Sequence, residues 1–388
     1  MPLLCTVCAK EPHLKALIEI DGKKAKCDIC EEEGIVLSSS DNRFFQLCKA
    51  LVRFHFNEWD YNPHWGGDGY EQIFYGEDNI FFNESRAVSA DMYEELAMDI
   101  SQGAVYEEYD KGVTVFAGYF DGVQNELLRS IKTSLDPTLL SMAKRLKTEN
   151  HFDLETELKE ILNSFERIAT TILQPEEILY RARIGYAARK TSLDSGFEME
   201  YHYAPYSGKD IGAPSPFIAS AGRANRVGVS FLYCATNEKT AISEIRPHPG
   251  DRVSVGSFRL KREMKAYDLS KSHLLHYFES DELLDTYIPL NTLRILINKT
   301  ITPAERSQYS ITQLITDCIR QLGFDAVIFE STVGTGTNTV VFNSSDAEYI
   351  DASARIYLVD RVDYKFSNEK IVSAEPDYVE DILPAAMR

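Results

Sequence analysis

No stretch of this sequence is long and apolar enough to cross a lipid bilayer, which takes roughly 18 consecutive apolar residues. The first residues, MPLLCTVCAKEPH, also lack the basic start and the apolar segment of a secretory signal peptide. We therefore expect a cytoplasmic protein without a membrane partner.

Positive charge is scarce as well. The 388 residues include 60 acidic and 41 basic side chains, so that the formal net charge is −19. Binding to a nucleic-acid backbone depends on Lys and Arg side chains that displace its counterions, and an anionic protein repels that backbone. A nucleic-acid partner is therefore disfavoured, whereas a local basic pocket for a small phosphate-bearing ligand is compatible with a well-solvated acidic surface.

The sequence contains no internal repeat and no low-complexity tract. Apolar residues make up 44% of it, which is enough for sizeable cores, and its length favours two or three domains. The pattern is mainly helical in the first half and rich in short strands afterwards. We expect an α+β protein with a zinc ribbon at 1–36, a helical domain at 41–172, an α+β domain at 175–347 and a strand with an acidic tail at 348–388.

Cysteine is concentrated at the N-terminus, where four of the seven cysteines follow the pattern C-x2-C-x18-C-x2-C. This spacing is typical of a structural zinc site with four thiolate ligands and no open position. Two disulfides are the alternative, which a reducing compartment disfavours. Between the two pairs we expect a small hairpin that turns at Asp21 and Gly22. The expected ligands are Cys5, Cys8, Cys27 and Cys30, and the ordinary buried cysteines are Cys48, Cys234 and Cys318.

The helical part shows several helix boundaries. Asp41 is a plausible cap for a helix that follows an acidic linker at 31–42, Pro137 can open another helix, and Asp153 is a plausible cap for a third. Residues 123–135 also have a helical pattern. Together these segments predict a helical bundle.

The second half alternates short strands with turn residues, and one helix interrupts it. This helix is expected to begin at a capping box formed by Ser310 and Gln313 and to end at Gly323. The expected strands are Ile178–Arg183, Val227–Tyr233, Val253–Arg259, Ala326–Glu330, Thr339–Asn343 and Ile356–Val362.

The stretch from Gly222 to Arg246, GRANRVGVSFLYCATNEKTAISEIR, carries the clearest functional pattern. It places Arg223 and Asn225 on a glycine-punctuated turn, Tyr233 at the end of a strand and Glu244 on a short helix. Arginine binds phosphates, tyrosine offers a ring for stacking, and a glutamate can stabilise a sugar cation. The combination indicates a nucleotide site, although a solvated helix residue is the plain alternative for Glu244.

Two further segments extend this pattern. In LYRARIG, strand alternation sends Arg181 and Arg183 to one face, where a surface salt-bridging pair is the alternative explanation. In FESTVGTGTNTVVF, a loop between two strands carries Ser331 and precedes Asn338. Backbone N–H groups in such a loop can bind an anion, but hairpin turns use the same residues.

These pieces, in this order and at this spacing, resemble the RES domain family, which is named for its arginine, glutamate and serine. The resemblance covers roughly residues 177–345. The helical region with its cysteine pairs looks like the N-terminal part of longer RES proteins, which is described as HEPN-like. The resemblance implies a fold similar to ADP-ribosyltransferases and an enzyme that consumes NAD, often as the toxin of a bacterial toxin–antitoxin pair.

The resemblance also implies roles for single residues. Arg181 and Arg223 would bind the pyrophosphate or ribose of NAD, Tyr233 would line the nicotinamide pocket, and Glu244 would be the catalytic carboxylate. Asn225 matches the family motif without an assigned role.

Ser331 would lie near the ribose, with Asn338 in support. Breaking the nicotinamide–ribose bond leaves a sugar with oxocarbenium character, which a nearby carboxylate can stabilise. The acceptor is open between water, inorganic phosphate and a protein side chain. Regulation through a protein partner or a homo-oligomer formed by the N-terminal region is compatible with the extra length.

Three alternatives stay open at this point. The first is a protein ADP-ribosyltransferase. The second is a HEPN-type ribonuclease, since Arg145 and His151 have the spacing of its motif, although Leu146 stands where that motif has a polar residue. The third is a non-enzymatic module that only binds a nucleotide.

Overall fold

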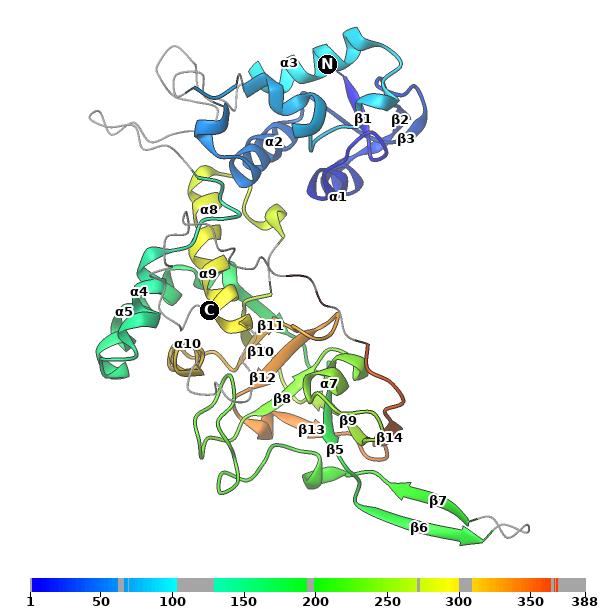
Figure 1. Cartoon of the computed structure of the whole chain (residues 1–388), viewed down its shortest axis with the longest axis vertical. Helices are drawn as coiled ribbons and strands as arrows, with labels where there is room; N and C mark the ends of the chain where they lie inside the picture. The colour runs from blue at the N-terminus through cyan, green and yellow to red at the C-terminus, as the bar shows by residue number, and fades with distance from the viewer. Residues whose placement is uncertain are drawn as a thin grey trace, which may run out of the picture. The chain divides into compact units, whose positions relative to one another are not determined.

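The computed structural model describes residues 2–61, 66–68, 70–102, 129–193, 199–270, 273–299, 309–363, 366 and 368. The chain divides into two compact units (Figure 1). Unit 1 consists of 1–140 and 271–292, and unit 2 consists of 141–270 and 293–388. Both helices and sheets are present, so the expected α+β class is confirmed. No helix within the described residues is long and apolar enough to cross a membrane.

Unit 1 begins with a three-stranded antiparallel sheet in the order β1-β3-β2. The strands are β1 (Leu3–Cys5), β2 (Lys23–Lys26) and β3 (Glu33–Ser38). β3 lies within the segment that we expected to be an acidic linker, so that expectation was wrong. Leu37 is buried, whereas Glu33 is exposed.

The segment between the two cysteine pairs is a helix, α1 (Pro12–Asp21), followed by β2, so the expected hairpin was wrong. The Glu11 carboxylate caps this helix by accepting hydrogen bonds from the backbone N–H groups of His13 (2.6 Å) and Leu14 (2.9 Å). Gly22 follows the helix, and a Cβ atom at this position would lie 2.3 Å from the carbonyl oxygen of Ile18. The chain therefore turns at Gly22, but from a helix into a strand.

The rest of unit 1 is helical. As expected, Asp41 caps α2 (Asn42–His55), because its carboxylate accepts from the backbone N–H of Arg43 (2.9 Å). Of the helix expected at 123–135, residues 123–128 lie outside the described part of the chain, and 129–135 contain a turn instead. Further elements are η1 (Glu58–Tyr61), η3 (Tyr70–Phe74), η4 (Gly76–Asp78), η5 (Glu84–Arg86), α3 (Ala90–Gln102), η8 (Leu274–His276) and α8 (Asp281–Asp285). Two helices run across the division between the units, α4 (Pro137–Arg145), which Pro137 opens as expected, and α9 (Tyr287–Asn298).

Unit 2 is built on a nine-stranded, mainly antiparallel sheet in the order β13-β9-β5-β8-β12-β11-β10-β4, in which β14 also pairs with β9. β10 and β11 pair in parallel. A separate two-stranded ribbon is formed by β6 (Ala188–Leu193) and β7 (Met199–Ala204). The strands of the large sheet are β4 (Thr170–Leu173), β5 (Ile178–Ile184), β8 (Leu232–Ala235), β9 (Arg252–Leu260), β10 (Met264–Asp268), β11 (Ala326–Glu330), β12 (Thr337–Val341), β13 (Ala347–Tyr349) and β14 (Arg355–Leu358).

Strands β5, β9 and β11 lie within a residue of their expected positions. The strand expected at Val227–Tyr233 begins only at Leu232. The preceding residues form a turn in which Gly228 has a φ of +80° and the Asn225 side chain binds the carbonyl oxygen of Val229. A side-chain hydrogen bond therefore takes the place of strand pairing here.

The helices of unit 2 are α5 (His151–Ser164), α6 (Glu166–Ala169), α7 (Glu238–Glu244) and α10 (Ser310–Gln321). α5 begins earlier than expected, with Asn150 and not Asp153 as its cap. The capping box expected at Ser310 and Gln313 was also wrong, since Tyr309 precedes α10 without a side-chain cap. The Gln313 side chain binds a neighbouring loop instead.

The two faces of the large sheet carry two apolar clusters. Leu179 of β5 belongs to one cluster, and Ala182 of the same strand belongs to the other, as strand alternation requires. Ala241, Ile242 and Ile245 pack into the second cluster, so α7 covers that face of the sheet. This packing fixes the helix whose last residue is Glu244.

Candidate functional site

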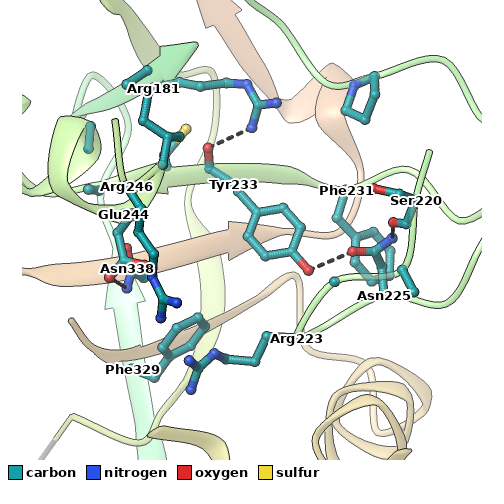
Figure 2. Close-up of a pocket in the computed structure, with 18 of the residues that line it drawn as sticks. Arg181, Ser220, Arg223, Asn225, Phe231, Tyr233, Glu244, Arg246, Phe329 and Asn338 are labelled. Carbon is teal, nitrogen blue, oxygen red and sulfur yellow. Dashed lines mark hydrogen bonds between the residues drawn. The ribbon is translucent and has the colours of Figure 1, made fainter. Parts of the chain in front are cut away.

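A cavity of about 660 Å³ opens in unit 2, where residues of β5, β8 and β12 meet α7 and the 218–231 loop (Figure 2). Its volume lies within the range of small-molecule sites. Ser331 does not line it, but its hydroxyl contacts Glu244. The expected site residues that line it are Arg181, Arg223, Asn225, Tyr233, Glu244 and Asn338. Lining residues that the sequence did not suggest include Phe231, Arg246, Tyr309 and Phe329.

Glu244 is held by two neutral donors. Its Oε1 accepts hydrogen bonds from the Ser331 hydroxyl (2.6 Å) and from the Asn338 amide (2.7 Å). Its Oε2 has no hydrogen-bond donor within the described part of the chain. One carboxylate oxygen is thereby fixed, and the other remains able to bind a group in the cavity.

The loop 331–336 places Ser331. The Ser331 hydroxyl oxygen accepts from the backbone N–H groups of Val333 (3.2 Å) and Gly334 (2.8 Å), so its proton is directed at Glu244. A Cβ atom at Gly336 would lie 2.4 Å from the hydroxyl oxygen of Thr236, which explains the glycine. These two N–H groups are used within the loop, where they orient the Ser331 hydroxyl.

Tyr233 and Asn225 are bound to each other. The Tyr233 hydroxyl donates to Asn225 Oδ1 (2.6 Å) and accepts from the backbone N–H of Ala224 (2.9 Å). Burial raises the pKa of Tyr233, so the phenol stays neutral. A Cβ atom at Gly222 would come within 2.6 Å of Asn225 Oδ1, so the turn needs glycine there.

The Asn225 amide nitrogen donates to three carbonyl oxygens of its own loop, those of Ser220 (3.0 Å), Arg226 (3.0 Å) and Val229 (2.8 Å). Asn225 therefore ties the loop together and connects it to Tyr233. This geometry gives Asn225 a positioning function that the sequence did not reveal.

Helix α10 holds the same loop from the other side. Gln313 Nε2 donates to the carbonyl oxygens of Gly222 (2.9 Å) and Asn225 (3.0 Å). The hydroxyl of Thr312, which is fully buried, donates to the carbonyl oxygen of Arg223 (2.6 Å). The only sequence signal for this contact is a pair of polar residues between apolar positions of an amphipathic helix.

Arg181 and Arg223 are cations without a carboxylate partner among the described residues. Arg181 donates to the carbonyl oxygens of Ile211 (2.9 Å) and Tyr233 (2.9 Å). Arg223 donates to the carbonyl oxygen of Ile297, and its guanidinium lies 5.8 Å from the centre of the Phe329 ring. Burial lowers the pKa of both arginines, which marks a site where a bound anion would be stabilising.

Two other arginines of interest do not line this cavity. Arg183 is exposed and stacks on the Tyr206 ring at 4.2 Å. Arg145 forms ion pairs with Glu149 (3.0 Å) and Glu157 (3.0 Å). Its expected ribonuclease partner, His151, instead contacts Arg226 (2.9 Å), so the contacts of this pair give no support to a ribonuclease site.

The cysteine cluster in unit 1 has the geometry of a metal site. The Sγ atoms of Cys5 and Cys30 lie 3.8 Å apart, those of Cys8 and Cys27 lie 3.9 Å apart, and all four lie within 4.8 Å of one another. A zinc tetrahedron with bonds of about 2.3 Å has sulfur atoms about 3.8 Å apart. None of the four forms a disulfide, so the donor set fits zinc.

Arg86 lies beside these sulfur atoms, and the thiols of Cys30 and Cys8 raise its pKa. A positive side chain at this place offsets the negative charge of four thiolates around a divalent ion. The remaining cysteines, Cys48, Cys234 and Cys318, are buried as expected, and burial raises their pKa.

The family model of the RES domain matches residues 193–367. The chain carries a RES domain. Arg223, Tyr233, Glu244 and Ser331 lie within the matched residues, whereas Arg181, on β5, precedes them. The boundaries expected for the domains, and the HEPN-like character of the region before the RES domain, stay predictions.

A search of curated proteins found no match. Among solved structures, this chain is similar to one chain of the crystal structure of the M. tuberculosis MbcT-MbcA toxin-antitoxin complex, with 9% sequence identity and a TM-score of 0.30. The similarity covers 52% of this chain and 93% of that chain.

Replacing Gln313 with alanine should loosen the 220–229 loop, because two loop carbonyl groups lose their donor. We expect a loss of about 1–3 kcal/mol in the free energy of unfolding and faster hydrogen exchange of the Gly222 amide, measured by mass spectrometry. Gln321→Ala is the matched control, since Gln321 lies on the same helix and its side chain binds Lys159 and Glu155 at the surface. Equal exchange of the Gly222 amide in both variants would contradict the conclusion that Gln313 holds this loop in place.

Purified protein should contain close to one zinc ion per chain by elemental analysis. Cys30→Ser should lower the zinc content and the melting temperature of unit 1, because a tetrathiolate site loses a ligand. Cys48→Ala should keep the zinc, since Cys48 is buried outside the cluster. Native protein without zinc, or Cys30→Ser with undiminished zinc, would disprove the assignment.

Proposed function

We propose that the RES domain of this protein cleaves the nicotinamide–ribose bond of NAD. The observation that carries the proposal is Glu244, a carboxylate that Ser331 and Asn338 fix at a cavity lined by three arginines. A fixed carboxylate beside cationic side chains is suited to a substrate that combines a diphosphate with a ribose from which a neutral group departs.

The proposed reaction needs little acid catalysis. As the bond between C1′ of the ribose and the pyridinium nitrogen breaks, its electron pair leaves with nicotinamide, which becomes neutral. The ribose acquires oxocarbenium character. The Glu244 carboxylate, through Oε2, would hydrogen-bond a ribose hydroxyl and offset the developing positive charge.

The other residues would bind and orient the substrate. Arg181 and Arg223 would bind the pyrophosphate or the ribose of NAD, since neither has a carboxylate partner among the described residues. The Tyr233 ring would line the nicotinamide pocket, with its hydroxyl already held by Asn225. The arginines also make this cavity a cationic site in a protein with a net charge of −19, which favours an anionic small molecule.

The acceptor would be water or inorganic phosphate, which makes the protein an NAD glycohydrolase or an NAD phosphorylase. With water, the oxygen adds to C1′ and a proton is lost, so the products are ADP-ribose and nicotinamide. With phosphate, a phosphate oxygen adds to C1′ and a phosphorylated ADP-ribose forms. A bacterial toxin or defence effector that a protein partner or homo-oligomer regulates through the N-terminal region would fit this activity.

Purified protein should release nicotinamide from NAD, and Glu244→Gln should lower kcat about 100-fold or more, because the charge that stabilises the ribose cation is lost. Ser331→Ala should lower it about tenfold to 100-fold through the loss of one hydrogen bond to a charged group. Both rates are measured by chromatography of nicotinamide, with and without phosphate.

Glu238→Gln is the matched control for these variants. Glu238 lies on the same helix, where it binds Arg355 and Tyr357, and it does not line the cavity. Full NAD cleavage by Glu244→Gln, or none by the unmodified protein, would refute the proposal. Transfer of labelled ADP-ribose to protein would favour an ADP-ribosyltransferase instead.

A further inference from the structure

We propose that Arg246 binds the diphosphate of the substrate together with Arg223, so that these two arginines form one anion clamp. The identity of that substrate rests on the function proposed above. The clamp itself is inferred from the position, the backbone and the charge of Arg246.

Arg246 follows Glu244 by two residues and lines the same cavity. Figure 2 shows its side chain passing Glu244 in the direction of the Phe329 ring, and the Arg223 guanidinium lies 5.8 Å from the centre of that ring. Its backbone N–H donates to the carbonyl oxygen of Ser243 (3.0 Å), which ends α7. A cationic side chain of the 220–229 loop and one that follows α7 therefore lie near each other in the cavity.

The backbone of Arg246 is in an unfavourable conformation. Its φ is +49°, in the left-handed region that favours glycine, and Pro247 follows it. This conformation is destabilising for a residue other than glycine, and such residues are found often at functional sites. In this conformation the long cationic side chain of Arg246 lines the cavity.

The charges of Arg246 and Arg223 repel each other. Burial lowers the pKa of Arg223, and the nearby charge of Arg246 lowers it further, whereas Glu244 acts in the opposite direction. Glu244 is the one carboxylate lining the cavity among the described residues, and it lies beyond ion-pair distance of both guanidinium groups. The Arg246 side chain itself forms no hydrogen bond or ion pair with the described residues.

A dianion between the two guanidinium groups would remove this repulsion, and arginine is the residue best suited to bidentate contacts with phosphate oxygens. Arg181 is not part of this clamp. It lies on the opposite side of the Tyr233 ring in Figure 2, where its guanidinium is bound to the carbonyl oxygens of Ile211 and Tyr233. Arg181 would therefore contact another part of the ligand.

The variant Arg246→Gly removes the guanidinium but suits the backbone conformation, so it tests the two features separately. Glycine is favoured at positive φ, so the melting temperature should be unchanged or higher. The KM for NAD should rise about tenfold or more, with kcat changed much less, because a charged hydrogen-bonding partner of the diphosphate is lost. Arg246→Lys should give a smaller rise in KM. Arg259→Ala, which removes an arginine that pairs with Glu176 and Glu348 outside the cavity, should leave KM unchanged.

Binding of inorganic pyrophosphate, measured by calorimetry, tests the clamp without any turnover. We expect about tenfold weaker binding for Arg246→Gly and for Arg223→Ala. In the double variant, the loss of pyrophosphate affinity should be smaller than the product of the losses in the two single variants, since both residues hold one anion.

Unchanged pyrophosphate affinity in Arg246→Gly, or no binding by the unmodified protein, would overturn the clamp. The two proposals fail separately in these assays. If NAD is cleaved and Arg246→Gly has a normal KM and normal pyrophosphate affinity, the clamp is wrong and the function stands. If NAD is not cleaved but pyrophosphate binding depends on Arg246, the clamp stands and the function is wrong.

Discussion

The hydrogen bonds to Oε1 of Glu244 connect the parts of the site. Ser331 reaches this oxygen from the loop after β11, Asn338 from β12, and Glu244 itself stands at the end of α7. The strand order of the sheet brings these three residues together, because β12 lies between β11 and β8, and α7 follows β8 in the chain. Residues separated by more than 80 positions in the chain are thereby held within hydrogen-bonding distance.

The loop that carries Arg223 depends on a second set of contacts. Asn225 fixes the loop from within, and Thr312 and Gln313 fix it from α10 through backbone carbonyl groups. These donors bind the backbone of the loop, while the Arg223 guanidinium contacts the carbonyl oxygen of Ile297 and lines the cavity. An arginine whose main chain is already anchored loses less backbone freedom when it binds a ligand, which favours affinity.

Sequence reasoning succeeded where one residue decides a local structure, and it failed where a distant partner decides it. Asp41 capped its helix as expected, and β5 and β11 followed their apolar patterns, because these features depend on near neighbours. Between the cysteine pairs, spacing alone did not distinguish a hairpin from the helix that Glu11 caps. Gln313 matched a capping box, but two loop carbonyl groups more than 80 residues away bind its amide. The motif residues could be found from the sequence, whereas Arg246 became visible only through its backbone angle and its place in the cavity.

The choice of donors around Glu244 has a chemical consequence. An arginine bound directly to this carboxylate would orient it but would also neutralise it, and so weaken its effect on a developing cation. Ser331 and Asn338 orient the carboxylate while carrying no charge. The arginines that line the cavity lie beyond ion-pair distance of Glu244, so its negative charge is not cancelled by a direct contact. The site thus keeps positive charge for an anionic ligand and negative charge for a cationic reaction centre within one cavity.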